Sequence, residues 1–380
     1  MNASPRAARA FSARLSALLF AFAPPAFADW GLNLPRGITE ISRDVYLMHM
    51  VVLWICVVIG VAVFGVMTYS IVKHRKSVGA KPAQFSHSTT AEIVWSVVPF
   101  FILVAMAIPA AKALIKMEDS SNSELTVKIT GHQWKWEYEY PDYGIRFFSN
   151  LGEASRKARE LDSGIDPRTV PNYLLEVDKP MVLPTGTKVR FLLTSNDVLH
   201  AWWVPDFAVK KDAVPGFIRE MWTVVDEPGT YRGQCAELCG RDHGFMPVVV
   251  EAVSAAQFDQ WVVGEQTAAA AEAGAADREW TISELMERGQ AVYNTNCVAC
   301  HQANGQGIPG AFPGLVGIED KLTLEQHLDV VLNGVPATAM QAFGAQLSDA
   351  DIAAVVTYER NAWGQQKEEM LQPSEVRAAR

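Results

Sequence analysis

Two long apolar segments constrain this chain more than any other feature of its sequence. Residues 46–72 and residues 93–111 contain no Asp, Glu, Lys or Arg. A helix needs roughly 20 apolar residues to cross the hydrocarbon core of a bilayer, and both segments reach that length. We therefore predict a membrane protein with a hairpin of two transmembrane helices, the first over 46–72 and the second over 92–114.

The charges between the two segments set the orientation of the hairpin. Residues 73–91 contain Lys73, Arg75, Lys76 and Lys81 and no acidic residue. Short loops rich in Lys and Arg stay in the cytoplasm. The short segment 29–45 and everything after the second helix then lie outside. In a Gram-negative bacterium this makes the chain a multi-pass protein of the inner (plasma) membrane, with its folded domains on the periplasmic side.

The first 28 residues have the pattern of a secretory signal peptide. Three arginines without an acidic residue precede a short apolar stretch, and residues 26–28 have the A-x-A cleavage pattern. The alternative is an uncleaved membrane anchor, which Pro24 and Pro25 disfavour because they interrupt the apolar stretch. We therefore expect residues 1–28 to be a signal peptide.

Residues 125–263 differ in pattern from the hairpin. Short runs rich in β-branched residues, such as 125–130, 188–193 and 247–251, are bounded by Gly, Pro and Asp. Such runs predict several short strands, arranged as an antiparallel sandwich or barrel. Residues 264–278 lack large apolar side chains, and we interpret them as a linker.

Residues 279–365 have the pattern of a helical domain. Thr281 with Glu284, Thr323 with Gln326, and Ser348 with Asp351 have the spacing of helix starts. The Gly- and Pro-rich stretch 305–317 predicts a loop. The polar residues 366–380 are expected to form a loose tail.

A haem-attachment motif lies in this helical region. Cys297-Val-Ala-Cys300-His301 is the pattern of covalent c-type haem binding, with the histidine as one iron ligand. A redox dithiol or a chance pair of cysteines would leave the adjacent histidine unexplained. Met340, in a predicted loop, is the expected second axial ligand. We expect Met286 to pack in the core and His327 to face solvent.

A second cluster of soft ligands precedes the linker. Cys235, Cys239, His243 and Met246 lie within one short run, and two thiols, an imidazole and a thioether together favour copper. A disulfide between the cysteines would leave His243 and Met246 without a role. Zinc would use the cysteines and the histidine but gain nothing from the methionine.

This run resembles the binuclear CuA site of cytochrome c oxidase subunit II. The resemblance extends over roughly residues 44–261 and includes the aromatic stretch 131–140, His200 in Asp197-Val-Leu-His200, and Glu92-Ile-Val-Trp95. It implies that 125–263 is an all-β, cupredoxin-like domain. The appended all-α cytochrome c domain resembles the fused subunit II of caa3-type oxidases.

The resemblance also implies roles for individual residues. Cys235 and Cys239 would bridge two coppers, and the other copper ligands would be His200, His243, Met246 and the carbonyl oxygen of Glu237. The Glu237 side chain would help to hold a magnesium ion at the interface with subunit I. Trp134 would receive the electrons, unless it is only a packing aromatic. Glu92 would lie at the mouth of a proton pathway, unless it is only an acid favoured at a helix N-terminus.

These features predict the electron-input subunit of a haem–copper cytochrome c oxidase in aerobic respiration. Electrons would pass from cytochrome c, or another donor, through haem c and CuA to the oxygen-reducing centre of subunit I, and subunit III is expected as a further partner. The oxygen site of this proton-translocating enzyme must lie on another subunit, because this chain lacks clustered intramembrane histidines. A net charge of −9 argues against a nucleic-acid partner.

Two other classes of protein remain as alternatives. One is a freestanding, membrane-anchored electron carrier without an oxidase partner. The other is a copper-delivery thiol protein, which would have a thioredoxin-like fold. A quinol oxidase subunit is disfavoured, because that branch lacks the copper ligands.

Overall fold

The computed structural model describes residues 33–81, 84, 86–160, 163–275, 277–336, 338–364 and 368–380. The predicted signal peptide, residues 1–28, lies outside these described residues. Residues 36–380 belong to one unit, to which all the contacts below belong.

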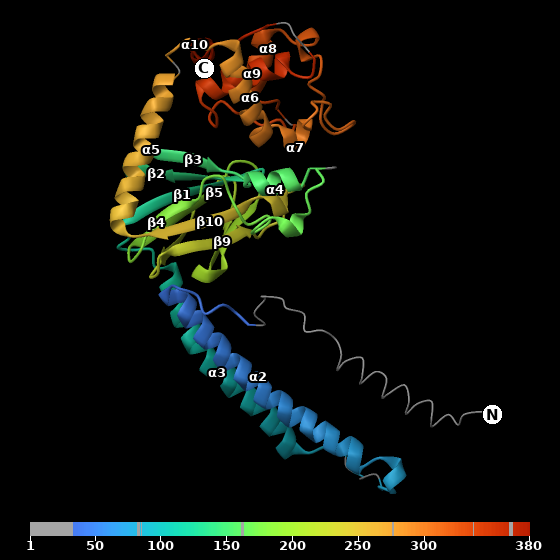
Figure 1. Cartoon of the computed structure of the whole chain (residues 1–380). Helices are drawn as coiled ribbons and strands as arrows, with labels where there is room; N and C mark the ends of the chain where they lie inside the picture. Colours follow the sequence, from blue (N-terminus) through green and yellow to red (C-terminus); the bar gives the residue numbers. More distant parts are fainter. Residues whose placement is uncertain are drawn as a thin grey trace, which may run out of the picture. The chain divides into compact units, whose positions relative to one another are not determined.

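Two long helices form a hairpin at the start of this unit (Figure 1). They are α2 (Glu40–Lys73) and α3 (Thr89–Glu118), and each is long and apolar enough to cross a membrane. The Lys116 ammonium contacts the carboxylates of Glu40 at 2.5 Å and Asp44 at 2.7 Å, which joins the end of α3 to the start of α2. Apolar side chains along both helices are exposed, as a lipid environment requires.

The β-rich region folds into two five-stranded sheets that face each other. The first sheet has the order β3-β2-β1-β5-β8 and the second the order β4-β10-β9-β6-β7. The strands are β1 (Leu125–His132), β2 (Lys135–Tyr140), β3 (Ile145–Ser149), β4 (Met181–Pro184), β5 (Lys188–Ser195), β6 (His200–Val204), β7 (Val209–Ala213), β8 (Arg219–Val224), β9 (Gly229–Cys235) and β10 (Pro247–Val253). The sandwich is confirmed, but its sheets are mixed, since β1 pairs with β5 and β4 with β10 in parallel. Both parallel pairs join strands distant in sequence, which local patterns do not reveal.

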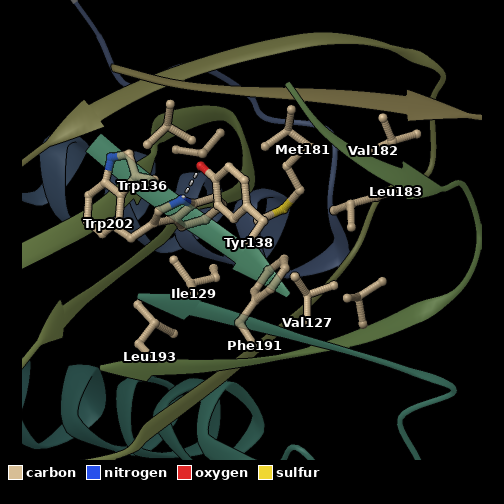
Figure 2. Packing of buried hydrophobic residues seen from close by; sticks show 14 of the residues in the cluster. Val127, Ile129, Trp136, Tyr138, Met181, Val182, Leu183, Phe191, Leu193 and Trp202 are labelled. Carbon is tan, nitrogen blue, oxygen red and sulfur yellow. Dashed lines mark hydrogen bonds between the residues drawn. The ribbon is translucent and has the colours of Figure 1, made fainter. Parts of the chain in front are cut away.

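Large aromatic side chains fill the space between the sheets. Trp136, Tyr138 and Trp202 are completely buried, and Figure 2 shows them packed among aliphatic side chains of both sheets. The Trp202 indole N–H donates to the Tyr138 hydroxyl over 3.2 Å, so both buried polar groups have a hydrogen-bond partner. This rigid core supports the end of the sandwich at which the site residues gather.

The segment expected as a linker is helical. Helix α5 (Ala255–Ala275) starts on the sandwich, where Phe258 and Val262 are buried, and continues through most of residues 264–278. Alanine has the highest intrinsic helix propensity, so the lack of large apolar residues did not prevent a helix. A short helix, α4 (Glu153–Ala158), follows β3.

The C-terminal region is helical, as predicted. Its helices are α6 (Ile282–Asn296), α7 (Val298–His301), α8 (Leu324–Asn333), α9 (Asp349–Asn361) and α10 (Pro373–Ala379). Thr281, Thr323 and Ser348 cap α6, α8 and α9, which confirms the three predicted helix starts. A β-carbon on Gly289 would lie 2.1 Å from the Ala354 carbonyl oxygen, so α6 and α9 cross closely because position 289 has no side chain.

Two expectations for this region were wrong. His327 is buried rather than exposed, and its Nε2 lies 2.9 Å from a carboxylate oxygen of Glu359 on α9. The acidic residue that pairs with it is distant in sequence, and a pairing of this kind offsets the cost of burial. The tail is also ordered in part, because Leu371 and Val376 are buried and α10 packs against α9.

Candidate metal and haem centres

One loop between paired strands carries most of the predicted copper ligands. Strand β9 ends at Cys235, and the chain returns as β10 from Pro247, with Gln234 opposite Pro247 in an antiparallel pair. Both ends of the loop therefore lie at one end of the second sheet. Because the loop closes on itself, it places three further side chains beside Cys235, namely those of Cys239, His243 and Met246.

His200 reaches the same place from the neighbouring strand. It is the first residue of β6, and Trp202 of that strand pairs with Cys235. The imidazole is completely buried beside Gly131, where a β-carbon would lie only 2.7 Å from the histidine ring. Residue 131 must therefore be glycine for the ring to occupy this position.

The donor atoms of these residues form a continuous cluster. The two sulfurs are 3.9 Å apart, Cys235 Sγ lies 4.0 Å from His200 Nδ1, and Cys239 Sγ lies 3.6 Å from His243 Nδ1. Met246 Sδ is 3.5 Å from Cys239 Sγ, and the Glu237 carbonyl oxygen is 3.4 Å from Cys235 Sγ. Metal–thiolate bonds are about 2.3 Å long, so sulfurs at this separation can share one ion.

The charge of the thiol pair suits a soft metal ion. Hydrogen bonding from Cys239 lowers the pKa of the Cys235 thiol, and the bond to His200 acts in the same direction. The same bond between the sulfurs raises the pKa of Cys239. Cys235 therefore loses its proton more readily than Cys239, and neither thiol is in a disulfide. Cys235 and Cys239 therefore do not form the disulfide that the sequence analysis considered as an alternative.

Asp197 lies beside the cluster, although the sequence analysis assigned it no role. One of its carboxylate oxygens lies 2.9 Å from His200 Nε2, and the other accepts the Gln133 amide N–H at 2.7 Å. Burial alone would lower the pKa of His200, but its bonds to Asp197 and Cys235 outweigh this effect and raise it. A carboxylate behind a metal-binding histidine is common, so an acid three residues before His200 was a usable signal.

The other predicted residues of this domain lie around the cluster. Trp134 is half-buried, and its indole N–H donates to the Cys239 carbonyl oxygen over 3.1 Å. The Glu237 side chain is exposed beside Leu238, which is 82% exposed. Glu92 lies in the first turn of α3, which belongs to the helical hairpin and not to the sandwich.

The haem motif forms one turn of helix after α6. The Cys300 and His301 amides both donate to the Cys297 carbonyl oxygen, which places the two thiols and the histidine within this single turn. His301 Nδ1 lies 2.9 Å from the carbonyl oxygen of Pro313 in the predicted loop. That bond holds the ring with Nε2 directed away from Pro313, so Nε2 is free to bind iron. These residues fit a covalent haem.

Met340 and Met286 both border the haem-domain core. Met340 lies in the loop between α8 and α9, as predicted, and Met286 lies on α6. Both side chains pack partly buried against the core of the domain. Burial therefore does not separate the two methionines, and the position of Met340 in a loop remains the reason to prefer it as a ligand.

The fold and these two clusters define a class: a membrane-anchored cupredoxin-like protein with an appended c-type cytochrome domain. Three family models match the chain. Residues 28–113 match the transmembrane domain of cytochrome c oxidase subunit II, and residues 125–253 match its periplasmic domain. Residues 284–358 match the model of cytochrome c oxidase, cbb3-type, subunit III.

Two relatives and one solved structure illustrate what this chain is similar to. The chain is 37% identical to the probable cytochrome c oxidase subunit 2 of Rickettsia bellii (strain RML369-C), over 63% of this chain and 86% of the relative. It is 38% identical to the mitochondrial subunit 2 of Vigna unguiculata, over 68% of this chain and 67% of the relative. The crystal structure of the periplasmic domain of subunit II (CoxB) of Bradyrhizobium japonicum is 38% identical, covering 39% of this chain and 97% of that one, with a TM-score of 0.34.

The chain belongs to the cytochrome c oxidase subunit II family. It is the electron-input subunit of a haem–copper oxidase, with a CuA-type domain on the periplasmic side of a membrane and a C-terminal cytochrome c domain. It therefore associates with other oxidase subunits. The alternatives of a freestanding carrier and of a thioredoxin-like copper-delivery protein are set aside, the second also because two facing sheets are not a thioredoxin-like fold.

Proposed function

We propose that this chain is subunit II of a caa3-type oxidase in the inner membrane. Its C-terminal domain accepts electrons from cytochrome c or another donor, and its sandwich domain delivers them to subunit I. When bound, a covalent haem and a binuclear copper centre supply the one-electron carriers. The observation that carries this proposal is the convergence of two thiols, two imidazoles, a thioether and a carbonyl oxygen at one end of the sandwich.

Each residue of the copper cluster has a proposed task. Cys235 and Cys239 would be shared by the two ions, and His200, His243, Met246 and the Glu237 carbonyl oxygen would complete the ligand set. Shared thiolates would let two coppers hold one electron between them, and strands β6 and β9 would limit rearrangement of the ligands. The lowered pKa of Cys235 favours the thiolate form that a soft metal ion needs.

The haem domain has a matching assignment. Cys297 and Cys300 would form the thioether bonds, and His301 would bind iron through Nε2 because Pro313 holds Nδ1. Met340 would supply the second axial ligand. A His/Met pair raises the reduction potential of a haem, which suits a domain that accepts electrons from outside.

Residues at the periphery of the sandwich complete the proposal. The exposed Glu237 side chain helps to hold a magnesium ion at the interface with subunit I. Trp134 receives electrons, since its indole is bonded to the backbone of Cys239. Glu92, exposed in the first turn of α3, lies at the mouth of a proton pathway. Subunit III is the expected additional partner.

Metal analysis together with EPR of the oxidised, purified complex tests the assignment. The binuclear proposal predicts two copper ions from this chain and one unpaired electron shared equally between them. A single copper or a zinc ion at the cluster would contradict it. The haem assignment is tested separately by mass spectrometry of the denatured chain, which should retain one haem.

A further inference from the structure

Arg159 is a charged residue of the sandwich domain that the proposed function does not use. It ends the short helix α4, within the segment of residues 150–180 that joins β3 to β4. The Gly152 amide donates to the Glu176 carbonyl oxygen over 2.8 Å, and the Glu176 carboxylate accepts from Arg232 of β9 over 3.1 Å. These bonds anchor the segment on the strand that ends at a proposed copper ligand, so Arg159 extends from a fixed base.

The Arg159 guanidinium binds the carboxylate of Asp242 through two hydrogen bonds. They are 2.8 and 3.0 Å long, and each joins a different nitrogen to a different oxygen. This pairing fixes a carboxylate in position and in orientation, which a lysine ammonium does not do. The Asp242 side chain is only 5% exposed, and a buried charge needs a partner. Arg241 also faces this carboxylate, but its Nε lies 3.9 Å away, too far for a hydrogen bond.

Asp242 belongs to the loop of residues 236–246, here called the copper loop, and directly precedes the proposed ligand His243. The loop makes one 3₁₀ turn that begins at His243, and the Phe245 amide closes it by donating to the Asp242 carbonyl oxygen over 2.9 Å. The Arg159 guanidinium carbon lies 3.7 Å from the ring centre of Phe245, where an aromatic face attracts a cation. Arg159 therefore contacts the copper loop on both sides of His243.

The two proposed histidine ligands are held in different ways. His200 lies on a strand, is completely buried, and has its Nε2 bonded to Asp197 over 2.9 Å. His243 lies in the copper loop, is half-buried, and has its Nδ1 3.6 Å from Cys239 Sγ. In the part of the chain that the structure describes, no side chain is bonded to the other nitrogen of His243. The place of this ring therefore depends on the loop backbone, which Arg159 and Asp242 hold.

We propose that Arg159 and Asp242 are positioning residues for His243. The pair holds the copper loop so that the His243 imidazole stays beside Cys239, where both can reach one ion. Losing the pair weakens copper binding and makes the two copper positions unequal, although every ligand is still present. The inference rests on the proposed function, since the place of His243 matters to copper only if His243 is a ligand.

Arg159→Leu in the full-length, purified complex tests the proposal. Loss of a group that orients a metal ligand typically costs about 10- to 100-fold in metal affinity, and competition with a copper chelator should show a loss of this size. EPR should show an electron shared unequally between the two coppers. Arg168→Leu is the matched control and should change neither, because Arg168 lies in the same segment, is 90% exposed and binds Asp166.

An affinity within about threefold of wild type, with an unchanged EPR spectrum, would overturn the positioning role of Arg159. It would leave the proposed function intact, because that function is judged on the unmodified protein. A wild-type complex without a pair of coppers at this cluster would contradict the proposed function instead.

A double variant separates positioning from a purely structural role and covers the case in which Arg159→Leu does not fold. Replacing both members of a buried ion pair by apolar residues is often neutral for folding, so Arg159→Leu with Asp242→Leu should fold. Apolar contacts are non-directional and should not orient the loop, so its copper affinity should still fall by about tenfold or more. A double variant with the wild-type affinity and EPR spectrum would show that the pair serves only the fold, and would overturn the proposal.

Discussion

Replacing Asp197 by alanine should weaken copper binding without removing a proposed ligand. The carboxylate accepts hydrogen bonds from His200 Nε2 at 2.9 Å, from the Gln133 amide at 2.7 Å and from the Val198 amide at 2.6 Å. Burial would raise the pKa of Asp197, but these bonds outweigh it and lower the pKa, so the group is ionised at neutral pH. Its loss releases the His200 ring and both amides.

The substitution should reduce both the affinity for copper and the stability of the fold. Removing the hydrogen-bond partner of a metal-binding histidine typically costs 10- to 100-fold in metal affinity, which is about 1.4–2.7 kcal/mol. The two released amides add about 1 kcal/mol each to the loss of folding stability. The loss of folding stability from the two amides is therefore at most about 2 kcal/mol. It is an upper value because the Asp197 side chain is 24% exposed, so water can reach the amides and replace the lost acceptor.

Two measurements check the prediction. Competition with a copper chelator should show the affinity loss, and urea unfolding of the metal-free protein should show the stability loss. Asp197→Asn, which keeps one acceptor oxygen, should fall between wild type and alanine. Asp212→Ala, which removes an exposed carboxylate paired with Arg219 at 3.7 Å, is the control and should change neither quantity. A copper affinity within threefold of wild type for Asp197→Ala would refute the reasoning.

Three further changes should have distinct outcomes. Cys235→Ser should abolish the EPR signal of a shared electron, because a hydroxyl is too hard to replace a bridging thiolate; survival of the signal would contradict the bridge. Met340→Ala should leave the haem attached but lower its potential in a redox titration, and an unchanged potential would indicate another ligand. Gly289→Ala should destabilise the haem domain by about 1–3 kcal/mol in thermal unfolding, because the added carbon would lie 2.1 Å from the Ala354 carbonyl oxygen.

Local features of the chain were predictable because their physical causes are local. The helix starts at Thr281, Thr323 and Ser348 depend on side chains within three residues of each other. The ligands from Cys235 to Met246 lie on a single loop, so their spacing alone indicates a shared ion. The two apolar helices follow from length and composition.

Features that join distant segments were not predictable in this way. The parallel pairing of β1 with β5 depends on packing across the whole sandwich, and the expectation of antiparallel sheets missed it. The pairing of His327 with Glu359 required α8 and α9 to be placed side by side. Residues 264–275 became part of a helix because α5 is anchored on the sandwich by Phe258 and Val262 before it reaches them.

The sequence by itself determined the membrane hairpin, the soft-ligand loop and the haem motif. Each of these is encoded by residues close together in the chain, whose hydrophobicity and ligand chemistry act over short range. Only the tertiary structure decided that Asp197 supports His200 and that Lys135 is buried between Phe148 and Phe343. Those contacts exist because folding brings separate segments together and removes water between them, and burial then makes one hydrogen bond or one charge decisive.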